Sequence, residues 1–235
     1  MNKFWNWTKD VATGERVLRL EGMITDDDFW AWLTDGKTAK EFKEELNAGT
    51  GDITVWINSE GGDCFAAAQI YNALRDYRGK VTVKIDALAA SAASVVAMAG
   101  DVIEISPVGL IMIHNPFSYT EGDAAEMRAA AYMLDEVKET AINAYELKTK
   151  LPRKKLAQMM DDETFMHAQA AIELGFADRI IGEANQQASQ AKMSSRRQVM
   201  NSLATALKIA RRDENNVLPK EDTDAEKLRR RLYLY

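Results

Sequence analysis

The chain has 235 residues, 46% of them hydrophobic, which is enough for one sizeable core with extensions. A single cysteine excludes an internal disulfide, and with only two histidines it argues against a zinc site of cysteine or histidine type. No apolar run approaches the roughly 18 to 20 residues that span a bilayer, and the first residues lack the apolar stretch of a secretory signal. We therefore expect a cytoplasmic protein without membrane contact, metal or cofactor.

The net charge of −6 is unevenly distributed. Residues 1–185 carry 19 basic and 30 acidic side chains, a balance of −11, whereas residues 186–235 carry 11 and 6, a balance of +5. We predict an N-terminal arm at 1–14, a folded domain at 15–185, and a basic linker and tail at 186–235 with an amphipathic helix at 197–212. A solvated tail is the simplest interpretation. A tail that contacts assembly partners is the alternative, with nucleic acid the less favoured partner.

Hydrophobic periodicity predicts alternating strands and helices. In chain order we predict a strand at 16–20, a helix after the acidic residues 26–28, a short helix at 38–46, a strand at 53–57, a helix at 66–77, a strand at 81–85, a helix at 91–99 and strands at 102–105 and 110–113. A long helix at 122–149 follows, then a helix after Pro152, a helix at 168–174 and a strand-like segment at 176–181. The strand–helix–strand unit at 53–85 predicts an α/β fold with parallel strands.

Ser91 lies where a strand passes through a tight turn into a helix. The β-branched run 81–85 leads into small residues around Ser91, and an apolar helical pattern follows through Met98. A hydroxyl at such a turn is exposed and lies near the free N–H groups of the helix, as acyl transfer requires. Ser91 is therefore the candidate nucleophile. The alternative is a small residue that permits close helix packing, a role in which Ser94 is equivalent.

His114 is the candidate general base because it ends the apolar strand 110–113. The carboxyl ends of parallel strands share one crevice, so His114 and Ser91 are expected to face each other. The other histidine, His167, lies beside a predicted helix start and is interpreted as a capping or surface residue.

The oxyanion hole needs backbone N–H groups with no side chains in the way. Gly61 and Gly62 lie just past the carboxyl end of strand 53–57, and glycine permits a close approach to a substrate carbonyl. The N–H of Ala92, which begins a predicted helix, is the natural second donor.

Four motifs together resemble those of the ClpP-type serine peptidases: NSEGG at 58–62, AAS at 89–91, MIHNP at 112–116, and the segment 165–178. The resemblance extends from about residue 15 to residue 182. The sequences DALAASAAS at 86–94 and ETF at 163–165 are most similar to those of the ClpP-related head maturation proteases of tailed phages and prophages.

The resemblance implies a crotonase-like β-α superhelix, assembled into rings around an enclosed chamber. The long helix 122–149 would then make ring-to-ring contacts, although ordinary packing within the chain explains its apolar stripe equally well. The resemblance also assigns the site residues: Ser91 as nucleophile, His114 as general base, Gly62 and Ala92 as oxyanion donors, and Glu163 as the orienting acid, with the adjacent Asp162 as the alternative.

Three residues depart from the family's pattern. Glu60 replaces a proline, which loosens the turn and adds a charge near the oxyanion hole. Ala87 replaces a glycine, and Glu163 replaces an aspartate, with one methylene more of reach.

These observations predict a serine endopeptidase. The expected partners are further copies in a ring or stacked rings, a peptide or protein substrate, and a separate ATP-dependent unfoldase or phage scaffold and capsid proteins. The unfoldase would be separate because the chain has no phosphate-binding G-x-x-x-x-G-K-[ST] motif. Two alternatives stay open: a crotonase-like acyl-CoA enzyme, and a ring-forming assembly factor with a degenerate site.

Overall fold

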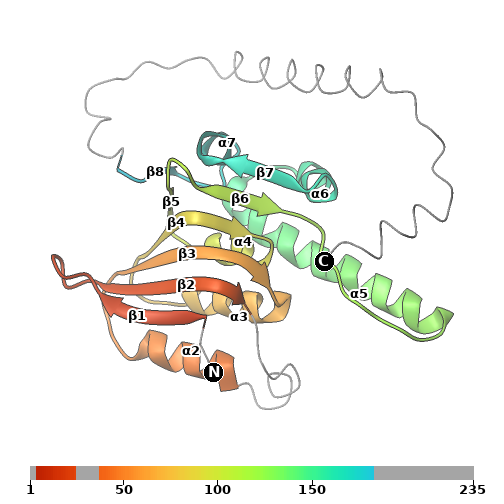
Figure 1. The fold of residues 1–235 in the computed structure, drawn as a ribbon, viewed down its shortest axis with the longest axis horizontal. Helices are drawn as coiled ribbons and strands as arrows, with labels where there is room; N and C mark the ends of the chain where they lie inside the picture. The colour runs from red at the N-terminus through yellow and green to blue at the C-terminus, as the bar shows by residue number, and fades with distance from the viewer. Residues whose placement is uncertain (1–3, 25–36, 183–235) are drawn as a thin grey trace. The chain divides into compact units, whose positions relative to one another are not determined.

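The structure, a computed structural model, describes residues 4–24 and 37–182 and has a mixed α/β architecture (Figure 1). The elements are β1 (Trp5–Lys9), β2 (Arg16–Ile24), α2 (Lys37–Asn47), β3 (Ile53–Gly62), α3 (Cys64–Arg75), β4 (Val81–Ala90), α4 (Ala92–Ala97), β5 (Val102–Ile105), β6 (Leu110–Ile113), α5 (Ala124–Thr149), α6 (Arg153–Asp161), β7 (Thr164–His167), α7 (Ala168–Glu173) and β8 (Arg179–Ile180). The helix predicted after residues 26–28 and the tail predicted at 186–235, with its helix at 197–212, lie outside the described residues. Among the helices that the structure describes, none is both long and apolar enough to cross a membrane.

Within residues 4–24 and 37–182, the strands form one eight-stranded sheet in the order β1-β2-β3-β4-β5-β8, with β6 paired to β4 and β7 paired to β6. β2, β3, β4, β5 and β8 are parallel neighbours, which confirms the parallel strands predicted for the unit at 53–85. β1 and β7 each pair antiparallel, with β2 and β6 respectively.

Several strands differ from their predicted bounds. β3 does not end before Gly61 and Gly62, as predicted, but continues through them, and they pair with Met23 and Ile24 of β2. β4 continues to Ala90, because pairing with β6 outweighs the low strand propensity of its small residues. β1 and β7 were not predicted, and the last strand is limited to Arg179–Ile180.

The N-terminal aromatic residues pack on the chain's own body. Phe4 and Trp5 are buried, and the Trp5 ring meets Phe42 of α2 edge to face. The N-terminal segment therefore packs on β2 and α2 of the same chain.

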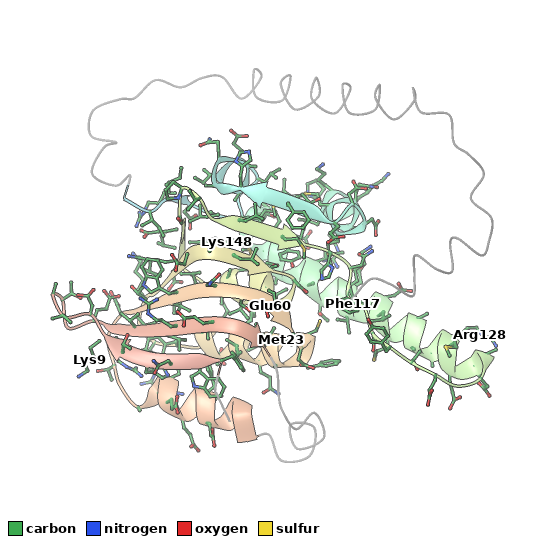
Figure 2. All side chains as sticks on the ribbon, in the orientation of Figure 1. Lys9, Met23, Glu60, Phe117, Arg128 and Lys148 are labelled. Carbon is green, nitrogen blue, oxygen red and sulfur yellow. The ribbon has the colours of Figure 1, made fainter. Side chains whose placement is uncertain are left out.

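α5 is only partly packed. Its buried residues, Ile142, Ala144 and Tyr145, all lie near its C-terminal end. The N-terminal half extends away from the sheet, as the position of Arg128 shows (Figures 1 and 2). The helix begins at a capping box formed by Asp123 and Glu126, so its start is locally stabilised without packing.

Strand register gathers the predicted site residues. The first half of β4 pairs with β5, but its last residues pair with β6, where Ala90 lies opposite Met112. Ser91 therefore follows β4 beside the end of β6, from which His114 continues. β7 runs antiparallel to β6 with Thr164 opposite Ile113, which brings Glu163 to the same end.

Candidate active site

The Ser91 turn has an uncommon backbone conformation. Ser91 has φ 53° and ψ −127°, a region that residues with a side chain rarely adopt and that is typical of nucleophile turns between strand and helix. Its N–H donates to the Met112 carbonyl at 2.9 Å, and its carbonyl accepts from the Ser94 N–H at 3.0 Å. Such a conformation persists only where the surroundings hold it, as these bonds do.

Ser91 and His114 lie within hydrogen-bond distance. The Ser91 Oγ is 2.8 Å from His114 Nε2, and both residues are partly exposed. Ser94, the equivalent alternative at the sequence level, is fully buried, so a substrate cannot reach it in this conformation. Of the two serines, only Ser91 has the geometry of a nucleophile next to a base.

The surroundings of His114 favour the neutral imidazole. Burial lowers the pKa of His114 below its ordinary value, and the carboxylate of Glu163 partly opposes this by raising it. Neutral imidazole is the form that accepts a proton. With its own proton on Nδ1, the ring accepts the Ser91 hydroxyl proton at Nε2.

Glu163 and Asp162 differ in their relation to His114. The charge of Glu163 acts on the imidazole, whereas the Asp162 carboxylate accepts from Gln158 Nε2 at 2.9 Å. Within the described residues, the His114 ring makes no hydrogen bond to either acid. Glu163 has φ 46° and an exposed side chain. The structure thus brings Glu163 near the base without the direct bond of a complete triad.

Gly61 lies against the Ser91 turn, and Gly62 lies against Ile24 of β2. A Cβ on Gly61 would lie 2.7 Å from the Ala90 carbonyl oxygen and 2.9 Å from the Ala92 nitrogen, and one on Gly62 would lie 2.1 Å from the Ile24 oxygen. Both glycines have positive φ, at 99° and 138°. The Gly61 N–H donates to the buried Ser59 Oγ at 3.1 Å, which restrains the end of β3 around Glu60.

Ala92 is the first residue of α4. As the start of a helix, it has no acceptor one turn back. Among the described residues, no group accepts a hydrogen bond from its N–H. This N–H is therefore available to a bound group beside Ser91.

Gly61→Ala is expected to lower the rate at which a fluorophosphonate labels Ser91 by at least about 100-fold, because the new methyl group displaces the Ala90–Ala92 backbone or stays strained at positive φ. Gly14→Ala is the matched control, since Gly14 also has positive φ but a Cβ there meets nothing within 4 Å. Labelling kinetics and thermal unfolding of both variants check this. Equal labelling rates in the two variants would contradict it.

A cavity of about 330 Å³ opens beside Ser91 between α3, α4 and α5. Its lining is mainly apolar and includes Ala67, Tyr71, Val95 and Ala141. Cys64, the single cysteine of the sequence, is half-buried at this wall. Sequence reasoning missed the cavity, because its residues come from three helices and carry no common motif.

No cluster of three or more histidine, cysteine, aspartate or glutamate side chains suited to a metal occurs in the described part of the chain. What the described residues do bring together is a hydroxyl, an imidazole, an available backbone N–H and an apolar cavity. These are groups that nucleophilic acyl transfer requires.

Comparison with known proteins agrees with this chemistry. A family profile described as Clp protease matches residues 39–184, which contain Ser91, His114 and Glu163. The ATP-dependent Clp protease proteolytic subunit of Deinococcus radiodurans is 29% identical over 134 residues. The aligned part covers 56% of this chain and 66% of that protein, slightly less than two thirds of its length.

Proposed function

Because this chain belongs to the Clp protease family, we propose that it is a serine endopeptidase with Ser91 as its nucleophile. The observation that carries the proposal is the 2.8 Å separation of Ser91 Oγ and His114 Nε2 at the wall of an apolar cavity. Sequence similarity alone supports only the family, whereas this geometry supports a working nucleophile.

In the proposed mechanism, His114 Nε2 takes the Ser91 hydroxyl proton as Oγ attacks the carbonyl carbon of the substrate. The carbonyl oxygen becomes an oxyanion, which accepts hydrogen bonds from the N–H groups of Gly62 and Ala92. Glu163 stabilises the imidazolium. His114 then gives its proton to the leaving amine, the peptide bond breaks, and an acyl-enzyme on Ser91 is left.

Water completes the cycle by the same steps. His114 takes a proton from the water as its oxygen attacks the acyl carbon, and then returns a proton to Ser91 Oγ. The carboxylic acid product leaves and the resting enzyme is restored. The apolar lining of the cavity supports a preference for substrates with an apolar side chain at the residue whose carbonyl is attacked.

We propose that the protein works as a ring of identical subunits. The support is the unpacked half of α5, which exposes Met127, Tyr132 and Met133 to an extent that ordinary packing within the described residues does not explain. The expected fold of each subunit is the crotonase-like superhelix. The amino-acid sequence of residues 86–94 supports phage head maturation as the biological role, with scaffold or capsid proteins as substrates.

A fluorophosphonate probe tests the proposed activity. Labelling is expected at Ser91, located by peptide mass spectrometry, and is expected to vanish in Ser91→Ala but persist in Ser94→Thr. The mass in solution is measured on the same samples. A labelled ring supports the proposal, an unlabelled ring supports the assembly factor with a degenerate site, and turnover of an acyl-CoA without peptide cleavage supports the crotonase-like enzyme.

A further inference from the structure

A buried hydrogen-bond chain joins α5 to the turn that carries Ser91. The Tyr145 hydroxyl lies 2.8 Å from Ser94 Oγ, and Ser94 Oγ lies 2.6 Å from the Ser91 carbonyl oxygen. Ser94 is 0% exposed and Tyr145 is 1% exposed. In the part of the chain that the structure describes, the Tyr145 hydroxyl has no other hydrogen-bond partner. The mechanism above uses neither side chain.

The direction of the chain follows from its chemistry. A carbonyl oxygen only accepts, so the single hydroxyl proton of Ser94 is donated to Ser91. Ser94 Oγ is then the acceptor for Tyr145, which must be the donor. Burial raises the pKa of Tyr145, so its hydroxyl keeps this proton near neutral pH. Protons therefore point from Tyr145 to Ser94 and from Ser94 to the Ser91 carbonyl.

The Ser91 carbonyl and the Ala92 N–H belong to one peptide unit. That unit is planar, and its oxygen and N–H point in opposite directions. Two hydrogen bonds from Ser94, one from its hydroxyl and one from its N–H, therefore fix the direction of the Ala92 N–H as well. The uncommon φ and ψ of Ser91 make this restraint necessary.

We propose that Ser94 and Tyr145 are positioning residues that aim the Ala92 N–H at the oxyanion. This inference rests on the proposed function, since it assumes that Ala92 N–H stabilises the transition state. Ser94 then has a role distinct from that of a nucleophile, and it acts only through the Ser91–Ala92 peptide. Tyr145 acts one step further away, through Ser94.

The test compares Ser94→Ala, Tyr145→Phe and the double variant with the wild-type chain. Thr54→Val is the matched control, because it also removes a buried, hydrogen-bonded hydroxyl but lies in β3 away from Ser91. The measurements are kcat and KM on a fluorogenic peptide and the affinity of a peptide boronate. Its tetrahedral adduct on serine places an oxygen where the oxyanion forms, so its affinity reports on the hole directly.

Ser94→Ala is expected to lower kcat about 10-fold with KM unchanged, and to weaken the boronate by about the same factor. Tyr145→Phe is expected to lower kcat and boronate affinity by a smaller factor, also with KM unchanged. The double variant should be no worse than Ser94→Ala, because the two hydroxyls act in series. Thr54→Val should match the wild type.

The inference is overturned if Ser94→Ala keeps kcat and boronate affinity within about twofold, if the loss is in KM alone, or if the two single effects multiply in the double variant. Should Ser94→Ala fail to fold, Tyr145→Phe decides alone, since it removes one oxygen atom. A wild-type chain that no fluorophosphonate labels overturns the proposed function and this inference together. A labelled wild type with unaffected variants overturns only this inference.

Discussion

Ser91→Ala and His114→Ala are each expected to lower kcat on a peptide substrate by on the order of 10⁴- to 10⁶-fold, and the double variant is expected to be no worse than either. The reason is the 2.8 Å contact between Ser91 Oγ and His114 Nε2, which makes them one functional unit. Without the imidazole the hydroxyl is a poor nucleophile, and without the hydroxyl the imidazole has nothing to activate. Steady-state kinetics on the purified variants check the expectation.

His167→Ala is the matched control for this experiment. His167 is the only other histidine, and its exposed side chain accepts from the Ala170 N–H at the start of α7. Its loss removes a helix cap, at a cost of about 1 kcal/mol of unfolding free energy, with kcat nearly unchanged. Equal losses in His167→Ala and His114→Ala, or a double variant far below both single variants, would refute the assignment of the pair.

The sequence alone predicted that the central strands of the sheet are parallel. It also predicted that Ser91 and His114 lie at the same edge of the sheet. The run 81–85 and the apolar strand 110–113 have clear strand patterns, and in a parallel sheet their carboxyl ends must share an edge. Ser91 and His114 each follow such an end directly. Their proximity therefore depends on topology more than on side-chain detail.

The position of Glu163, the proposed acid, was harder to predict because it depends on β7. The four residues Thr164–His167 have a weak strand pattern and are followed at once by a helix, so only their pairing with β6 makes them a strand. That pairing brings residue 163 to the base. A segment whose structure comes from a distant partner cannot be derived from local propensity. The same holds for the cavity and for the Ser94–Tyr145 contact, which joins residues 51 positions apart.

Glu163→Gln is expected to lower kcat by about 10-fold, because the Glu163 charge acts on His114 without a hydrogen bond, whereas Asp162→Asn is expected to stay within about twofold of the wild type. Both changes replace one carboxylate oxygen by an amide group and leave the size of the side chain nearly unchanged. The two carboxylates have different surroundings. The charge of Glu163 acts on His114, whereas the Asp162 carboxylate accepts a hydrogen bond from Gln158. The pair of variants therefore separates the two acids under matched chemistry.

The pH dependence gives a second readout for the same variants. Activity requires neutral His114, so kcat/KM rises with pH through the pKa of His114, which burial sets below its ordinary value. The Glu163 carboxylate raises this pKa by stabilising the imidazolium, so Glu163→Gln is expected to lower it and to move the acid limb of the profile to lower pH. Asp162→Asn should leave the limb in place. A limb that moves in Asp162→Asn, or that stays fixed in Glu163→Gln, would assign the orienting role to another group.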